Sequence, residues 1–384
     1  MNDSADNTIL IFIEVLNPDD GSLYHSLAGV RQDLEFIPLF FLAFAFVRST
    51  KALRMFAILL AVIAAANGVT NIVQFRESPQ QLASWGPGYK ERVLGTAQFS
   101  AAGRAFYSGG QQHTRPFGLM GDAGTGGLVC ALALGAILAL GSLRKRRRYV
   151  VLAGLAGTLA VAGVLTSQGR AVVVGSVVVL LAYALLSATT GRGMASALAA
   201  SALVGVAALA VSVIIGSGSG AAPVRYQGLT PAGIIQLTNQ NRGSSFRKIP
   251  DNFVHYPFGG GLGTGGPAAG VSGAPTSGAD TENEISYLTV EAGIPGMLLV
   301  VGFTLAVCGL GIKYCRHEPD PEARILLAAI IAPVVGILVL YSVNVPTPTT
   351  PGGPYLWAVG GIAAYWFIVR PAERRRAGAE TADG

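Results

Sequence analysis

Long apolar runs, separated by short polar connections, follow one another along most of the chain. A helix that crosses a bilayer needs about 20 mostly apolar residues. Seven runs fit that requirement: Ala52–Phe75, Gly121–Leu143, Tyr149–Thr166, Ala171–Thr189, Met194–Gly216, Ile285–Ile312 and Ile325–Val345. Two weaker runs, Leu34–Val47 and Pro354–Val369, bring the predicted number of spans to nine.

The runs are continuous, whereas a transmembrane barrel strand would alternate apolar and polar residues over about ten positions. The sequence therefore predicts an all-α polytopic membrane protein, with residues 1–384 as a single transmembrane domain. Of the residues, 51% are hydrophobic and 12% are charged, and the mean hydropathy is +0.51. Soluble domains have about 25% charged residues. This excludes a soluble globular enzyme, a disordered chain and a disulfide scaffold.

Lysine and arginine are unevenly divided between alternate connections. One set, of 45 residues in total, holds 16 of them: 48–54, 143–149, 190–193, 313–324 and 370–384. The opposite set, of 159 residues, holds the other 11. Because cytoplasmic connections are enriched in positive residues, the first set is predicted to be cytoplasmic, which makes 370–384 a basic cytoplasmic tail. Topology thus explains the net charge of +6, and we expect no nucleic-acid partner.

The same rule places the N-terminus outside, although the acidic start of the chain lacks the positive region of a signal peptide. Either an uncleaved first span inserts with its N-terminus outside, or further spans precede Met1 in the natural chain. The three cysteines, Cys130, Cys308 and Cys315, have no CxxC spacing and no histidine at metal-ligand spacing. We therefore expect neither a disulfide framework nor a metal site.

The segment 217–284 is predicted to be an extracytoplasmic loop of 68 residues, whereas connections usually have about 4–6. Two parts of it have helical character: 232–240, which follows a helix-capping Thr-Pro pair, and a turn or two at 245–255. The stretch 257–278 is rich in glycine, which no regular element would tolerate. A long loop on a chain of otherwise tight connections is where we expect the function to reside.

Four of the arginines on the predicted extracytoplasmic face are candidate site residues. Arg170 lies in a tight turn between two apolar helices, either as an interfacial arginine with its head in water or as a rigidly held anion-binding group. Arg115 opens an Arg-Pro-Phe-Gly sequence before a span, and Arg242 and Arg247 lie in the large loop. Each alone is typical of a solvated charge. As a group on one membrane face they indicate a diphosphate site, because a guanidinium offers paired donors to phosphate oxygens.

Acidic and amide side chains gather where the loop enters the seventh span. Glu282, Asn283 and Glu284 stand at its mouth, and Glu291, seven residues after Glu284, shares its helical face. An ionised carboxylate in hydrocarbon costs about 2.5–3.5 kcal/mol, so Glu291 is expected to face a polar interior. A packing hydrogen bond or a pair with a buried arginine is favoured over catalysis for Glu291. Glu282 is either a helix-capping acid or a catalytic one.

A polar stripe runs along the second predicted span on Asn67, Asn71 and Gln74, which share one helical face. Hydrogen bonds between helices are its simplest explanation. The glycines at 259–263 lack the lysine of a phosphate-binding P-loop, so we expect them to form a tight turn.

The segment from His255 to Gly263, HYPFGGGLG, resembles the "NPlfGvGlG" stretch of the O-antigen ligase and O-antigen polymerase superfamily of bacterial envelope glycosyltransferases. The later residues EN at 282–283 and EAGIPG at 291–296 are similar to that family's "HN…ElGliG" pattern at the start of a late helix. Upstream, TSQGRA at 166–171 resembles "tSRGa", and RPFG at 115–118 resembles "RptGtf". The order of these motifs carries the resemblance, which extends from Phe12 to Val369.

The resemblance implies a GT-C-like fold, a polyprenyl-diphosphate-linked glycan as donor, and inverting transfer without a metal or other cofactor. It assigns Arg170 and Arg242 to the diphosphate, with Arg115 and Arg247 as substitutes. Arginines can hold the charge of such a leaving group without a metal.

The resemblance also bears on the catalytic base. The family's histidine position is Glu282 in this chain, which favours the polymerase-like members and leaves the base open. Glu282 is the matching carboxylate, and Glu284 is the next candidate. Members of the family also have several helices before the segment that resembles 17–31, which agrees with further spans before Met1.

The sequence therefore predicts a membrane glycosyltransferase that polymerises or ligates lipid-linked oligosaccharide on the outer face of the cytoplasmic membrane. Its expected partners are that lipid-linked glycan, the lipid bilayer and other polysaccharide export proteins. A transporter or flippase for an amphipathic substrate is the alternative, and a structural partner of an export complex is another. Transporters commonly have repeated halves with spans broken at corresponding places, whereas the long loop here occurs once.

Overall fold

The computed structural model describes residues 23–86, 88–94, 105–108, 111–143, 147–187, 243, 245–265 and 283–382. Residues 245–255 are helical. The other elements, in chain order, are α2 (Leu23–Leu34), α3 (Pro38–Phe46), α4 (Thr50–Arg76), α5 (Pro79–Ala83), α6 (Tyr89–Leu94), β1 (Ala105–Ser108), β2 (Gln111–Thr114), α7 (Thr125–Leu143), α8 (Arg147–Thr166), α9 (Arg170–Ser187), α14 (Glu284–Tyr314), the 3-10 helix η1 (Cys315–His317), α15 (Pro321–Leu340), α16 (Gly352–Ala363), the π-helix η2 (Ala364–Val369) and α17 (Arg370–Ala382).

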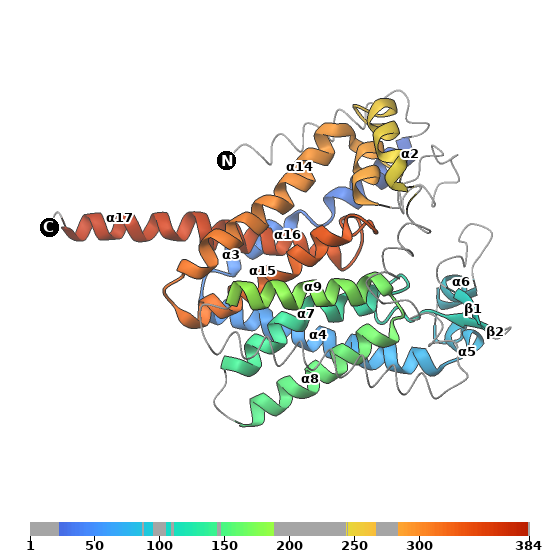
Figure 1. Cartoon of the computed structure of the whole chain (residues 1–384), viewed down its shortest axis with the longest axis horizontal. Helices are drawn as coiled ribbons and strands as arrows, with labels where there is room; N and C mark the ends of the chain where they lie inside the picture. Colours follow the sequence, from blue (N-terminus) through green and yellow to red (C-terminus); the bar gives the residue numbers. More distant parts are fainter. Residues whose placement is uncertain are drawn as a thin grey trace.

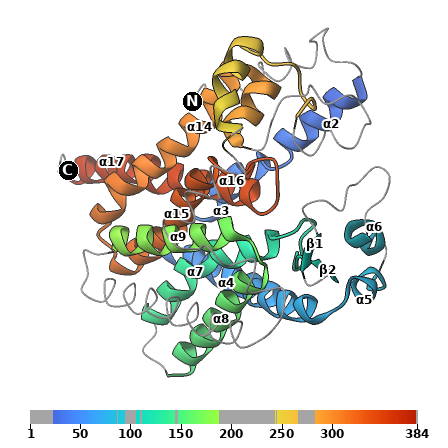
Figure 2. The same ribbon diagram turned by 45° about the vertical axis from the view of Figure 1, so that its right-hand side comes forward.

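The described helices form two groups joined by α15 (Figure 1). In the first group α4, α7, α8 and α9 pack against one another, and α15 lies against α7 and α9. In the second group α16 packs on α3 and α14, and α15 contacts both α14 and α16. Figure 2 shows the same division from another side. α7, α15 and the span Gly352–Arg376 are the most enclosed of the long helices.

Among the described residues, seven helices are long and apolar enough to cross a membrane: α4, α7, α8, α9, α14 with η1, α15, and α16 continued to Arg376. They confirm six of the seven stronger predicted spans and the weaker span at 354–369. The predicted span at 194–216 lies outside the described residues. The predicted span at 34–47 is not among the seven, because a turn at 35–37 ends α2 and leaves α3 with nine residues. The protein is thus a multi-pass, predominantly helical membrane protein.

Small residues let these helices approach closely. A Cβ added to Gly163 of α8 would lie 2.8 Å from the Cα of Gly68 on α4. A Cβ added to Gly135 of α7 would lie 2.9 Å from the carbonyl oxygen of Ala329 on α15. Lipid tails are as apolar as leucine side chains, so helices in a bilayer associate through such close packing.

A short hairpin departs from the all-helical prediction. β1 and β2 pair antiparallel, with Ala105 opposite Thr114, and the hairpin ends one residue before Arg115. With α5 and α6 it lies beyond the end of α4 (Figure 1). This part of the chain has no long apolar run, so its backbone groups can pair in a ladder instead of a spanning helix.

The predicted functional residues that the structure describes lie toward one end of the helices, which we call the loop end. Gly127 near the start of α7 lies against Ser167 in the α8–α9 turn. Gly175 near the start of α9 faces Leu340 at the end of α15. The amide of the first residue of α14 donates to the carbonyl of Tyr341 at 2.9 Å. The starts of α7, α9 and α14 therefore share this end with the end of α15.

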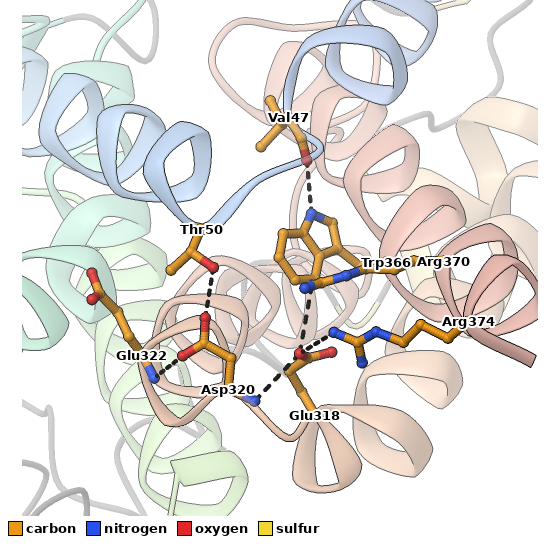
Figure 3. A network of polar contacts seen from close by, with 8 residues as sticks. All are labelled: Val47, Thr50, Glu318, Asp320, Glu322, Trp366, Arg370 and Arg374. Carbon is orange, nitrogen blue, oxygen red and sulfur yellow. Dashed lines mark hydrogen bonds and ion pairs between the residues drawn. The ribbon is translucent and has the colours of Figure 1, made fainter. Parts of the chain in front are cut away.

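The opposite end, which we call the basic end, contains an ionic and aromatic network (Figure 3). Glu318, whose side chain is 7% exposed, accepts a hydrogen bond from Arg374 at 3.1 Å and lies 3.5 Å from an Arg370 nitrogen. Arg370 stacks over Trp366, and Trp366 Nε1 donates to the carbonyl of Val47 at 2.7 Å. The α16–η2–α17 unit is thereby tied to the α3–α4 and α14–α15 connections.

Asp320 caps α15 in the same network. It accepts hydrogen bonds from the Glu322 amide at 3.0 Å and from the Thr50 hydroxyl at 2.6 Å. Burial raises the pKa of Asp320, but the bonds from Thr50 and from the Glu322 and Ala323 amides outweigh it and leave the pKa below its usual value of 3.8. Because Arg54 also binds Glu322, the starts of α4 and α15 are joined by two polar contacts.

We expect Glu318→Gln to lower the free energy of unfolding by about 1–3 kcal/mol, because the variant removes the nearly buried negative charge that two arginines share. Glu373→Gln, at an exposed site on α17, is the matched control and should change little. Thermal unfolding of the purified chain in detergent measures both variants. Equal Tm values for the two variants would contradict a stabilising role for the Glu318 network.

Candidate functional site

Two predicted site residues, Arg242 and Glu282, lie outside the described residues. The other predicted residues are all described, and the structure distributes them between the two helix groups. They are Arg115, Arg170, Arg247, Asn283, Glu284 and Glu291.

Arg170 is positioned by the sharp α8–α9 turn. Ser167 in this turn packs where Gly127 of α7 has no side chain, so the turn lies directly on the start of α7. Gln168 has a φ of 56°, a left-handed conformation that non-glycine residues seldom adopt. The chain reverses there, and α9 begins at Arg170, which is half-buried.

Arg115 also lies near the start of α7, in the segment of the chain that precedes this helix. It is half-buried in the segment between β2 and α7, and its Nη2 lies 3.4 Å from a Cβ added to Gly124. The Gly124 amide donates to the Pro116 carbonyl at 3.0 Å, which folds this segment back on itself just before α7. We call Arg115 and Arg170 the arginine pair. The positive end of the α7 dipole lies between their two segments, so the local field favours an anion.

A buried amide of α4 holds the segment that follows Arg115. Gln74 Oε1 accepts hydrogen bonds from the amides of Phe117 and Gly118 at 3.0 and 2.8 Å, and Gln74 Nε2 donates to the Gly118 carbonyl at 2.9 Å. Gln74 is 1% exposed. Three backbone groups of an irregular segment are thus satisfied by one side chain, which explains why an amide lies at this position of an apolar helix.

The other two amides of the stripe have different partners. Asn71 Nδ2 donates to the Gly163 carbonyl of α8 at 3.0 Å, which confirms the predicted hydrogen bond between helices. Asn67 Oδ1 instead accepts from the Leu119 amide at 3.0 Å. The stripe therefore links α4 both to α8 and to the segment before α7. Sequence periodicity located the stripe but not the loop that it holds.

Two polar atoms near the arginine pair are buried and make no hydrogen bond: Asn71 Oδ1 and Thr114 Oγ1. Asn71 Oδ1 lies 2.8 Å from a Cβ added to Gly126, in the first turn of α7. A buried polar group that lacks a partner costs about 1–3 kcal/mol.

The start of α14 forms the second group of predicted residues. Asn283 caps the helix, because its Oδ1 accepts from the Ser286 amide at 2.8 Å. Glu284 is fully buried and accepts hydrogen bonds from the hydroxyl and the amide of Thr347. Thr347 belongs to the connection between α15 and α16, so Glu284 fixes that connection to α14.

Helix α2 adds residues that the sequence analysis did not identify. Tyr287, one turn after Glu284 and fully buried, donates to Asp33 Oδ1 at 3.0 Å and accepts from Gln32 Nε2 at 2.6 Å. The polar Gln-Asp pair just before an apolar run was the available signal, because such residues at a membrane boundary usually face protein. We call Asp33, Glu284, Tyr287 and Glu291 the acid face.

The glycine-rich loop binds Glu291. Its two carboxylate oxygens accept hydrogen bonds from the Gly263 amide at 3.1 Å and the Gly265 amide at 2.9 Å. Gly259, Gly261 and Gly263 all have positive φ, which confirms the predicted tight turn. Glu291 is thus a hydrogen-bond acceptor in the packing of the loop on α14, with loop amides among its donors.

α14 is broken directly after Glu291. Gly293 has a φ of 68°, and a Cβ there would lie 2.6 Å from the carbonyl carbon of Phe258, so the loop can approach only a glycine. The Ile294 amide, freed by the break, donates to the Pro257 carbonyl at 3.0 Å. The glycine-rich loop and the broken helix carry two motifs of the family resemblance, and they pack as one unit.

Arg247 lies apart from the arginine pair. It is exposed on the helix 245–255, which is longer than the predicted turn or two. On this helix Phe253 packs against the cluster of Tyr287 and Leu288. Arg247 therefore accompanies the acid face and not the start of α7.

The two groups of predicted residues lie on different helices. Arg115 lies in the segment before α7 and Arg170 begins α9, whereas the acid face belongs to α2 and α14. Both views show the starts of α2 and α14 across α15 and α16 from the starts of α7 and α9 (Figures 1 and 2). The first group suits phosphate oxygens, and the second offers carboxylates at a membrane boundary.

We expect Gln74→Leu to release the segment before α7, because two buried amides lose their acceptor at about 1–3 kcal/mol each. Hydrogen exchange at Phe117 and Gly118 should rise at least tenfold. Thr70→Val, on the same helix, is the matched control, since the Thr70 hydroxyl bonds the Ala66 carbonyl of α4 itself. Unchanged protection of both amides would show that another group holds the segment.

A comparison with models of known protein families finds no match for this chain. A comparison with curated proteins finds no match either. Its function must therefore be inferred from the side chains that the fold brings together at the loop end, of which the arginine pair at the start of α7 is the most specific arrangement.

Proposed function

We propose that the protein is a membrane glycosyltransferase that polymerises or ligates a polyprenyl-diphosphate-linked oligosaccharide on the outer face of the cytoplasmic membrane. The observation that carries the proposal is that Arg115 lies at the start of α7 and that α9 begins at Arg170, directly after the turn that packs on α7. Two guanidinium groups beside a helix N-terminus form a strong site for phosphate oxygens.

In the proposed reaction an acceptor hydroxyl attacks the anomeric carbon of the donor sugar. Its proton passes to a carboxylate as the new carbon–oxygen bond forms. The bond between the anomeric carbon and the diphosphate breaks, and the diphosphate leaves with the electron pair. The arginine pair stabilises the negative charge that develops on this leaving group, and stabilisation of developing charge accounts for much of the rate acceleration in many enzymes. Attack opposite the leaving group inverts the anomeric centre.

The carboxylate that takes the proton is proposed to be Glu282. Glu284 is fully buried, and Thr347 engages it through two hydrogen bonds. This enclosure supports a positioning role for Glu284, because a base must reach within hydrogen-bond distance of the acceptor hydroxyl. Glu282 precedes the Asn283 cap by one residue, so its carboxylate is tethered to the mouth of α14.

The proposal includes a GT-C-like arrangement of nine spans and membership of the O-antigen ligase and polymerase superfamily. The runs at 34–47 and 194–216 supply the two spans beyond the seven described. The loop 217–284 lies outside and the tail 370–384 lies in the cytoplasm. The concentration of arginines around Glu318 at the basic end supports this orientation.

Transport of an amphipathic substrate is the second candidate, and the break in α14 at Gly293 is the observation that favours it. Transporters place substrate sites at such discontinuous helices. Here, however, the glycine-rich loop occupies the break, because Phe258 lies where a side chain on Gly293 would have to fit. Movement of labelled lipid-linked glycan across proteoliposomes, without any change in glycan length, would favour the transporter.

We expect Arg115→Gln and Arg170→Gln each to lower kcat by about 100-fold or more, the usual effect of losing one donor to a developing anion. In vitro turnover of a defined lipid-linked oligosaccharide by the purified chain measures this. Arg76→Gln, at an exposed position at the end of α4, is the matched control and should retain full turnover. Full turnover in both pair variants would refute the diphosphate site.

The variants of Glu282 and Glu284 should differ in kcat in the same assay. Glu282→Gln should lower kcat by about 100-fold to 10,000-fold, the range expected for a general base. Glu284→Gln keeps an acceptor for Thr347 and should lower kcat by less than about tenfold, with a lower Tm as its main effect. A reversed order of the two variants would assign the base to Glu284.

A further inference from the structure

Three consecutive aromatic residues in η2 contact different elements at the basic end. Tyr365 packs edge-on against Phe44 of α3, with ring centroids 6.1 Å apart. Phe367 stacks on Tyr314 of α14 at 6.3 Å. Trp366, between them, is directed toward Arg370 and the Val47 carbonyl (Figure 3). The end of α16 and its continuation thus have an aromatic surface on the α3 side and another on the α14 side.

A cation lies over each of these aromatic surfaces. The guanidinium carbon of Arg48 is 5.2 Å from the ring centroids of both Phe44 and Tyr365. Lys313 Nζ is 5.0 Å from the ring of Tyr314, which in turn stacks on Phe367. Arg48 and Lys313 therefore flank the same segment. Aromatic rings with cations at their edge are typical of the membrane–water interface.

Arg48 and Lys313 differ from the other cations of the network. Within the part of the chain that the structure describes, Arg54 is paired with Glu322, and Arg370 and Arg374 are paired with Glu318. No ion pair is found for Arg48 or Lys313 in those same ranges, and both side chains are exposed. Within the described residues, the positive charges of Arg48 and Lys313 thus have no neutralising carboxylate.

Apolar side chains lead from these cations along both helices. On α3, Phe41 is 53% exposed and Phe46 is 74% exposed. On α14, Leu305 is 51% exposed and Ile312 is 60% exposed. Phe40 and Phe303, with ring centroids 6.3 Å apart, bring the two helices together at the level of these chains. The surface is therefore apolar along its length and positive at one end.

We propose that an anionic phospholipid binds at the basic end, with its headgroup attracted by the charges of Arg48 and Lys313 and its acyl chains along α3 and α14. The charge of the surface selects this occupant, because a zwitterionic headgroup would bring a quaternary ammonium toward two unneutralised cations. The apolar strips match acyl chains, which run parallel to the helices. This lipid site is independent of the glycosyltransferase proposal, whose residues lie at the loop end.

The test is titration of the purified full-length chain in detergent with phosphatidylglycerol or phosphatidylcholine of identical acyl chains, read by native mass spectrometry. The wild-type chain should prefer phosphatidylglycerol. The double variant Arg48→Gln/Lys313→Gln should bind phosphatidylglycerol about 30-fold more weakly, because each cation near an anionic lipid contributes about fivefold. Its affinity for phosphatidylcholine should stay within about twofold.

Matched variants separate this site from general charge effects. Arg76→Gln/Lys90→Gln removes two exposed cations at the loop end and should leave the preference intact. Arg48→Lys/Lys313→Arg keeps both charges and should retain most of the affinity. If the double glutamine variant does not elute as a folded species, each single variant should still lose about fivefold. Equal affinities for the two lipids, or an unchanged preference in the glutamine variants, overturn the proposal.

Discussion

Backbone polar groups at membrane depth must find partners within the protein, and this constraint shapes the loop end. Two irregular segments lie there, one before α7 and one over the start of α14. A buried amide, Gln74, satisfies the first, and a buried carboxylate, Glu291, satisfies the second. Without these acceptors, each segment would leave amides unpaired in a medium where water cannot compensate.

The same two side chains determine where the candidate chemistry lies. Gln74 binds the amides of Phe117 and Gly118 and so positions Arg115 near the start of α7. The α8–α9 turn, which packs on the same helix start, positions Arg170. Because Glu291 holds the glycine-rich loop, the acid face is enclosed between that loop and α2. The polar residues inside these apolar helices are thus scaffold residues, and the groups that they position are the candidates for function.

Charged side chains have different kinds of partner at the two ends of the molecule. At the basic end, Glu322 in the first turn of α15 pairs with an arginine of α4, and Glu318 in the connection before α15 pairs with arginines of α17, which joins the two helix groups. Arg48 and Lys313 stay outside this pairing and rest on aromatic rings instead. At the loop end, carboxylates are held by amides and hydroxyls, and the arginine pair occupies a different helix group. In the proposed reaction, a substrate that contains both diphosphate and sugar would have to extend from the arginine pair to the acid face. The large loop would then have to contact this substrate.

Apolar run length by itself determined the spanning helices, because a bilayer-crossing helix requires a minimum length whatever its neighbours are. Helical periodicity likewise located the Asn67–Gln74 stripe, and glycine content located the turn at 259–263. The tertiary structure alone decided which groups meet. Asp33 lies next to Tyr287 only because α2 folds against α14 across more than half the chain. The break at Gly293 also depends on a partner distant in sequence, the backbone of Phe258. Local pattern fixes what a segment can form, whereas hydrogen bonds between distant segments decide what it binds.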